Sequence, residues 1–148
     1  MGDQAMHPAE RLLIERSCER LQARYAQTAD NGDIEGFVEL FVENGSVEVP
    51  EHRAFVGHAS IRESIRALAA TGLTMRHVIT NRLVTVIDET HAQGSCYLTV
   101  YNSDAEPDAS GIRPAGLPAT IGEYADRFTK TDAGWRFQSR VLKRVFRG

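Results

Sequence analysis

The chain has 148 residues and a formal net charge of −3, a length that fits one domain able to enclose a pocket as well as a core. Its 17 basic and 20 acidic residues form no basic cluster, so nucleic acid is not an expected partner. No segment approaches the roughly 20 apolar residues of a membrane span, and the start lacks a signal-peptide pattern. The sequence therefore predicts a single cytoplasmic domain over residues 1–148, with residues 1–7 as a disordered tail.

Three helices are predicted in the N-terminal half. Apolar residues recur at helical spacing in the first, and its start at Pro8 suits a first helical turn. Asn31 and Gly32 can end this helix, and Asp33 can cap the next one. The predicted helices are Pro8–Thr28, Ile34–Phe41 and Ile61–Ala70, and two short strands, Ser46–Val49 and Arg53–Val56, separate the last two.

After Gly72 the sequence is rich in Val, Ile, Thr, Tyr and Phe, which is the composition of β-strands. The segment Asp104–Pro118 contains three prolines and two glycines, which indicates a surface loop. Strands of about a dozen residues must curl, and helices on the concave face would close a hollow. We therefore expect an α+β fold with an antiparallel meander. Its strands are Thr74–Ile87, Gln93–Ser103, Ala119–Thr131 and Trp135–Phe146.

Several motifs occur in the order found in a known family. This series resembles the SnoaL-like branch of the nuclear transport factor 2-like superfamily, which includes scytalone dehydratase, hexachlorocyclohexane dehydrochlorinase and polyketide cyclases. The resemblance implies a cone-shaped domain with an internal pocket. In such a domain a curved mixed or antiparallel sheet wraps around three N-terminal helices. The fold carries several reactions and also subunits without chemistry. The motifs are Tyr25, Asp30-Asn31-Gly32-Asp33, Leu40-Phe41, Gly57-His58, Arg76-His77-Val78-Ile79-Thr80-Asn81 and Gly134-Trp135-Arg136-Phe137.

The resemblance also implies candidate site residues. In dehydratase and dehydrochlorinase members, an Asp at the end of the first helix pairs with a His on the first long strand, and Asp30 and His77 stand at these positions. Polyketide cyclases use an Asp on the penultimate strand, which Asp126 matches. Arg140 stands where related enzymes place a pocket arginine. The second histidine that scytalone dehydratase carries on the next strand corresponds to the neighbourhood of Asn102, an expected substrate-binding residue. Because Asn102 is not a histidine, this departure argues against scytalone as the substrate.

The chemistry of these residues suits proton transfer but leaves alternatives open. A pocket histidine can accept a substrate proton near neutral pH, and an adjacent carboxylate would fix its tautomer and stabilise its charged form. Asp30 is equally well explained as a turn residue at a helix end. Asp126 shares one strand face with Tyr124 and Phe128, where it either lines the hollow as an acid or base or pairs with an arginine such as Arg140.

The residue pattern of the last predicted strand, Trp135–Phe146, is relevant to the oligomeric state. Its apolar residues alternate with polar ones, which predicts one core face and one wetter face. Domains of this kind bury the open face of the sheet by pairing, so we expect a homodimer or homotrimer. The expected core residues are Trp135, Phe137, Val141 and Val145, and the expected outer residues are Arg136, Gln138, Arg140 and Arg144.

No cofactor and no metal are expected, because phosphate loops, dinucleotide fingerprints and metal-ligand spacings are absent. His52 is expected in a polar loop, and Cys18 and Cys96 as buried hydrophobes. Tyr25 and Tyr124 could bind a substrate oxygen, although a core role explains them as well.

We expect a cofactor-independent lyase of the dehydratase type, or an isomerase or cyclase. It would use general acid–base catalysis on a small hydrophobic, cyclic or aromatic molecule. One alternative is a non-catalytic ligand-binding or assembly subunit, such as the small subunit of ring-hydroxylating dioxygenases. Another is an epoxide hydrolase, for which the sequence offers Asp126 and Arg140 but no convincing third member of an Asp–Arg–Asp group.

Overall fold

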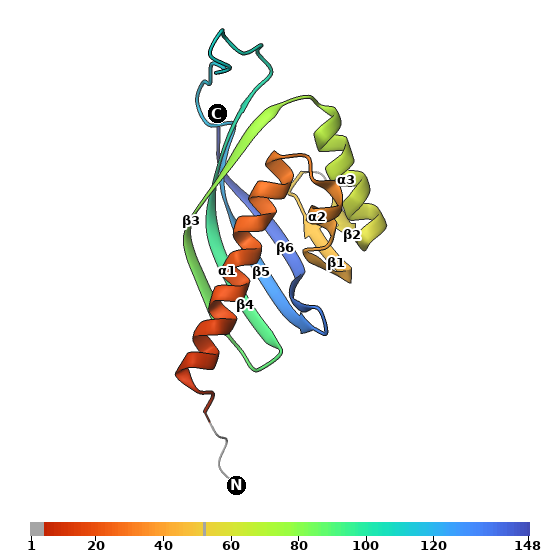
Figure 1. Ribbon diagram of the computed structural model, residues 1–148, viewed down its shortest axis with the longest axis vertical. Helices are drawn as coiled ribbons and strands as arrows, with labels where there is room; N and C mark the ends of the chain where they lie inside the picture. The colour runs from red at the N-terminus through yellow and green to blue at the C-terminus, as the bar shows by residue number, and fades with distance from the viewer. Residues whose placement is uncertain (1–4, 52) are drawn as a thin grey trace.

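The computed structural model describes residues 5–51 and 53–148. Within this range, three helices and six strands form one α+β unit (Figure 1). The helices are α1 (Pro8–Asp30), α2 (Ile34–Val38) and α3 (His58–Ala70). The strands are β1 (Phe41–Glu48), β2 (Ala54–Val56), β3 (Thr74–Val86), β4 (His91–Ser103), β5 (Thr120–Thr131) and β6 (Gly134–Arg147). Residues 104–119 connect β4 to β5 without regular structure.

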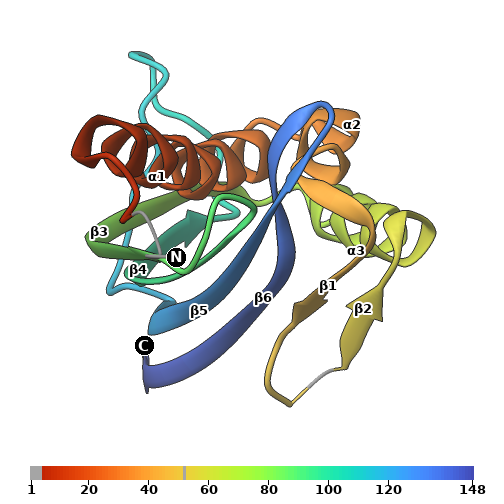
Figure 2. The ribbon, with the colours of Figure 1, turned by 90° about the horizontal axis from the view of Figure 1, so that it is seen from below.

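The strands form a single curved sheet in the order β2-β1-β6-β5-β4-β3. All neighbouring pairs are antiparallel except β1 and β6, which are parallel. α1 lies across the concave face of the long strands, while α2 and α3 lie beside β1 and β2 (Figures 1 and 2). The curved mixed sheet with helices on its concave side confirms the expected fold class. No helix in the described part of the chain is long and apolar enough to cross a membrane.

The first two helices end differently from the prediction. α1 continues to Asp30, and Asn31 caps it before Gly32 takes a φ of +65°. The predicted cap of α2 is confirmed, because a side-chain oxygen of Asp33 accepts a hydrogen bond from the Gly36 amide at 3.0 Å. The prediction that α2 reaches Phe41 is wrong, since Phe41 begins β1 and pairs with β6.

β1 also begins earlier than the predicted strand Ser46–Val49, so that it includes Asn44 and Gly45. These residues lie inside β1, where the register with β6 shifts between Phe41 and Ser46. A side chain at Gly45 would meet the Val42 carbonyl oxygen at 2.9 Å, so glycine permits this close approach.

Two expectations reach residues outside the described range. The predicted disordered tail includes residues 1–4, which lie outside it. Of the rest of that tail, Met6 packs against the core and the His7 ring accepts a hydrogen bond from the Ala9 amide at 3.1 Å, capping α1. His52, expected in a polar loop, also lies outside the described residues.

The core between α1 and the sheet is built on aromatic rings. The Tyr25 ring lies 4.7 Å from that of Phe37 and 5.5 Å from that of Tyr124, and Phe137 packs at 5.2 Å from Phe128. Such tilted and edge-on contacts add to the burial of apolar area. This packing fixes the end of α1 against the sheet.

Both cysteines are free and fully buried in this core. Burial raises the pKa of the Cys18 thiol to about 12 and that of the Cys96 thiol to about 11. They remain neutral thiols near pH 7, as expected of small hydrophobic residues.

The alternation predicted for β6 holds only as far as Phe137. Phe137 pairs with Phe128, whereas Ser139 pairs with the preceding residue Arg127, so β6 carries one extra residue at this point. Such a bulge reverses which residues face the core. Arg140 is therefore buried and Val145 is half-exposed. Beyond Gln138, the prediction of which residues face the core and which face outward is thus wrong.

Candidate functional site

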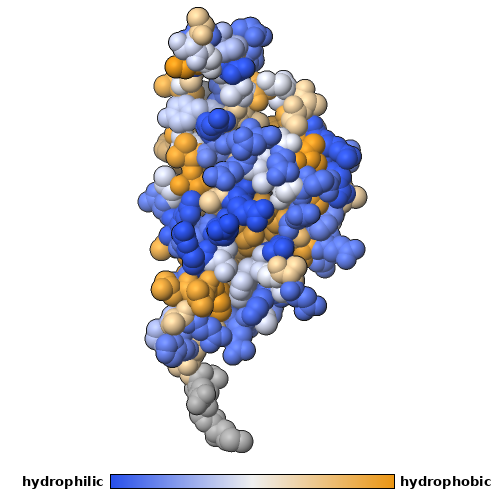
Figure 3. Space-filling view, viewed as in Figure 1, coloured by the Kyte–Doolittle hydropathy of each residue, from blue (hydrophilic) through white to orange (hydrophobic). Residues whose placement is uncertain are grey.

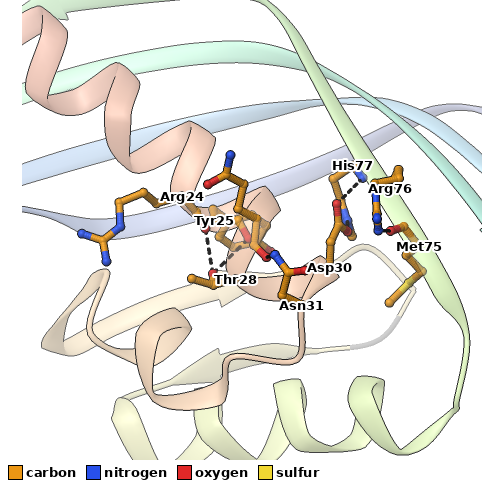
Figure 4. Close-up of polar contacts among 9 residues, drawn as sticks. Arg24, Tyr25, Thr28, Asp30, Asn31, Met75, Arg76 and His77 are labelled. Carbon is orange, nitrogen blue, oxygen red and sulfur yellow. Dashed lines mark hydrogen bonds and ion pairs between the residues drawn. The ribbon is translucent and has the colours of Figure 1, made fainter.

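Asp30 and His77 lie in direct contact where α1 ends against β3 (Figure 4). One Asp30 carboxylate oxygen is 2.5 Å from His77 Nδ1, and the other accepts a hydrogen bond from the His77 backbone amide at 2.9 Å. The side chains are only 7% and 10% exposed, respectively. The carboxylate therefore holds both the backbone and the ring of one residue.

Local structure explains why these residues meet. Asp30 is the last residue of α1, and two residues earlier the Thr28 hydroxyl donates to the Arg24 carbonyl at 2.7 Å. β3 packs against α1, and His77 is on the inner face of β3, on the same side as buried Met75. The Asp30 side chain thus approaches from α1 and the His77 side chain from β3, on opposite sides of the contact (Figure 4).

The dyad lies at one wall of a mainly apolar pocket of about 410 Å³. Helix α3 and strands β1 and β2 form the opposite side, and His77, Tyr25 and Arg144 contribute polar groups. A small ring compound fits such a volume. The apolar lining residues are Ala29, Phe37, Val47, Val49, Phe55, Ile65, Ala67 and Leu68.

The Asp30 contact also determines which His77 nitrogen can act. An ionised carboxylate only accepts hydrogen bonds, so Nδ1 must carry the proton that it donates to Asp30. Nε2 then has the free lone pair. Since His77 lines the pocket, Nε2 is the atom available to accept a proton from a bound molecule.

The other predicted carboxylate belongs to a separate, fully buried ion pair. Arg140 donates from Nε to Asp126 Oδ1 at 2.8 Å and from Nη2 to Asp126 Oδ2 at 3.2 Å. Gln22 donates to the same carboxylate at 3.0 Å. Both charged side chains are 0% exposed, and neither lines the pocket beside His77. Of the two alternatives for Asp126, the structure shows the pair with Arg140.

Two tyrosines enclose this ion pair. The Arg140 guanidinium carbon lies 3.7 Å from the centroid of the Tyr124 ring and 4.3 Å from that of Tyr25, distances of strong cation–π contacts. Burial alone would lower the pKa of Arg140, but the Asp126 charge raises it overall. Burial also raises the pKa of both tyrosines, which remain neutral phenols. Tyr25 thus connects the ion pair to the pocket wall.

Asn102 lies elsewhere. It pairs with Met75 on the adjacent strand and lines a different hollow, together with Leu73 and loop residues such as Asp104 and Pro114. The structure therefore does not place Asn102 with the dyad, although its strand β4 is the neighbour of β3, which carries His77.

Arg144 is the pocket residue that sequence reasoning missed. Strict alternation along β6 placed it on the outer face, but the bulge before Arg140 turns it inward. The signal in the sequence was mixed, because Leu142 and Phe146 are at even positions whereas Val141 and Val145 continue the odd phase of Trp135 and Phe137. A change of phase inside a strand indicates a bulge.

Metal-binding side chains do not cluster in the described part of the chain. Among residues 5–51 and 53–148, no three His, Cys, Asp or Glu side chains lie together as metal ligands would.

Comparison with known proteins identifies the family. Residues 10–141 match the model of the SnoaL-like domain. No curated protein matches the sequence. A solved NTF2-like protein with a cystatin-like fold from Novosphingobium aromaticivorans is 32% identical, with 96% of this chain and 90% of that chain covered and a TM-score of 0.74. A variant of Rv3472, a protein of unknown function from Mycobacterium tuberculosis, is 31% identical, with 95% and 78% covered and a TM-score of 0.77.

A more distant structure agrees in fold. A scytalone dehydratase-like protein from Novosphingobium aromaticivorans is 22% identical, with 95% of this chain and 89% of that chain covered and a TM-score of 0.80. This likeness concerns the fold alone. The matched family model spans most of the sequence, and the chain therefore belongs to the SnoaL-like family, with the NTF2-like, cystatin-like fold.

Proposed function

We propose that the protein is a cofactor-independent lyase or isomerase that moves a proton on a small hydrophobic, cyclic or aromatic molecule. The single observation that carries this proposal is the Asp30–His77 contact at the wall of an apolar pocket. His77 is the proposed catalytic base and Asp30 its positioning residue.

The proposed step begins at His77 Nε2, which takes a proton from a substrate carbon. The C–H electrons form a new double bond within the substrate. In an elimination, the leaving group departs with the electrons of its own bond. In an isomerisation, the imidazolium returns the proton to another carbon. Asp30 supports the step because its carboxylate stabilises the positive charge on the ring.

Proton removal can be measured without knowing the natural substrate. We expect the protein to accelerate the exchange of α-hydrogens of 2-indanone for deuterium in D₂O, followed by proton NMR. His77→Gln should lower the rate by a factor of about 10²–10⁴, the contribution of a positioned general base. Asp30→Asn should lower it less, because the base remains but its ring orientation is no longer fixed by a charge.

His91→Gln is the matched control. His91 also contacts an aspartate, at 3.0 Å from Asp88, but both side chains are 56% exposed on a hairpin. This variant should exchange hydrogens at the wild-type rate. Full activity in a folded His77→Gln variant would refute the proposed role.

A second candidate function is a ligand-binding or assembly subunit, which a different observation favours. Apolar and aromatic side chains remain exposed on the outer face of β3 and β4, among them Leu83 at 71% and Tyr97 at 52%. If the protein binds 2-indanone without exchanging its hydrogens, in the wild type as in His77→Gln, this second function is the better account.

A further inference from the structure

Arg144 is the charged group of the pocket whose role the proton transfer leaves unassigned. Two other polar lining residues have partners in their own helix, since the Ser64 hydroxyl donates to the Ile61 carbonyl and the Thr71 hydroxyl to the Leu68 carbonyl, both at 2.7 Å. Their hydrogen-bonding capacity is directed away from a ligand. The guanidinium is therefore the strongest polar group left to orient one.

Glu51 holds Arg144 at the edge of the pocket. Arg144 Nη1 donates to one Glu51 oxygen at 3.2 Å, and Arg147 Nη2 donates to the other at 2.6 Å. The Arg144 side chain is 24% exposed, against 66% for Arg147. A partly desolvated guanidinium binds a carboxylate more strongly than an exposed one does.

A further arginine packs on a residue of the pocket wall. Arg53 lies 5.1 Å from the ring centroid of Phe55, a residue of the pocket wall. Arg144 and Arg147 together bring two positive charges against the single carboxylate of Glu51. One carboxylate shared by two arginines leaves Arg144 with unused donors, since a guanidinium has five N–H groups. Among the described residues, Arg144 donates a side-chain hydrogen bond to Glu51 alone.

We propose that Arg144 is the anchor for a carboxylate of the ligand, so that the substrate class is a small apolar ring or chain bearing a carboxylic acid. The proposal rests on the proposed function in placing the reacting carbon near His77. The apolar body would pack between α3 and α1, and the carboxylate would take the Arg144 donors that Glu51 does not use. The guanidinium would also offset negative charge that develops on a substrate oxygen as the proton leaves.

The test compares two probes of the same shape, 2-naphthoate and 2-naphthamide, by isothermal titration calorimetry at low ionic strength. We expect the wild type to bind the carboxylate about tenfold more tightly than the amide, the effect of one charge-assisted hydrogen-bonded pair. Arg144→Gln should remove this preference while leaving the affinity for the amide unchanged.

Arg147→Gln is the matched control, because it removes the same charge from the same partner, Glu51, yet Arg147 does not line the pocket. It should keep the preference. Glu51→Gln provides a second, independent variant. It removes the negative charge beside Arg144 and should strengthen binding of the naphthoate several-fold without affecting the amide.

The anchor would be overturned if the wild type bound both probes with equal affinity, or if Arg144→Gln kept the preference for the naphthoate. It would also be overturned if Arg147→Gln lost this preference to the same extent as Arg144→Gln, because the preference would then reflect the general positive charge rather than a contact with Arg144. Should Arg144→Gln fail to fold, a Glu51→Gln variant that binds naphthoate no more tightly than the wild type would overturn it as well. The same titration in His77→Gln separates the two proposals, because the anchor predicts a preserved preference there even if no exchange of hydrogens is found.

Discussion

Arg140 is a fully buried cation, and its surroundings compensate its charge almost completely. Asp126 pairs with it through two hydrogen bonds, the Cys96 sulfur accepts a further one at 3.3 Å, and two tyrosine rings cover it. Arg140 Nη1 and Gln22 Oε1 nevertheless are buried without a hydrogen-bond partner in the described structure. A buried ion pair of this kind tolerates the loss of both charges better than the loss of one.

We therefore expect Arg140→Met to lower the free energy of unfolding by about 3–5 kcal/mol, because Asp126 is left as an unpaired buried charge. The double variant Arg140→Met with Asp126→Leu should recover part of this loss. Urea denaturation followed by circular dichroism measures both. Arg127→Met, at an exposed position of β5, should change the free energy by less than about 0.5 kcal/mol. A single Arg140 variant as stable as this control would contradict the interpretation.

Site residues differed in how far the sequence could identify them. The pairing of Asp30 with His77 was implied by the resemblance to the family, whereas the residues alone explained Asp30 equally well as a turn residue at a helix end; the structure shows the two side chains in contact. The two readings of Asp126 could not be separated, because a carboxylate on an inner face suits a pocket and an ion pair equally. Arg144 was placed on the wrong face, since its orientation depends on a bulge rather than on its own chemistry.

Two long strands change the face of their side chains partway along. In β3, Thr80 pairs with Tyr97 whereas Leu83 pairs with Ser95, so one extra residue lies between them. Met75 and His77 point inward before this bulge, and Val86 points inward after it. Periodicity gives the existence and approximate ends of a strand but assumes an unbroken alternation. The bulge of β6 therefore accounts for the error in the predicted faces of that strand.

Asn81 forms the bulge of β3 with a φ of +52°, a conformation that β-branched residues avoid. Asn81→Gly should be close to neutral, whereas Asn81→Val should lower the free energy of unfolding by roughly 1–2 kcal/mol. Urea denaturation again provides the measurement. Thr85→Val is the control, because Thr85 is exposed in regular β3 structure and valine suits that backbone. Equal stability of the two valine variants would show that the left-handed conformation costs little.

At the scale of the molecule, no helix among residues 5–51 and 53–148 covers the outer face of the sheet (Figure 2). The apolar and aromatic residues exposed on adjoining strands β3 and β4 are Val78, Leu83, Tyr97 and Tyr101, and a hollow of about 470 Å³ between Leu83 and Val141 lies on the same face. By contrast, the face that includes α1 is mainly hydrophilic (Figure 3). An exposed apolar sheet face is typical of an interaction surface, and self-association through this face stays a prediction.

Sedimentation velocity at micromolar concentration should show a dimer or trimer. Tyr97→Lys should shift the protein toward monomer, since a buried charge would oppose contact through this face. Leu117→Lys changes an 84% exposed residue of the β4–β5 loop and should leave the assembly intact. A wild-type protein that sediments only as monomer would exclude the expected assembly.

The parallel pairing of β1 with β6 has a consequence for the time at which the protein becomes functional. β1, β2, α2 and α3 are synthesised before the long strands, but in the sheet they join those strands only through β6. The pocket is lined by α1 and by residues of both groups, and Arg144 comes from β6 itself. During synthesis on the ribosome, β1, β2, α2 and α3 therefore cannot join the sheet of long strands until β6 has emerged from the exit tunnel. The pocket forms only after that point.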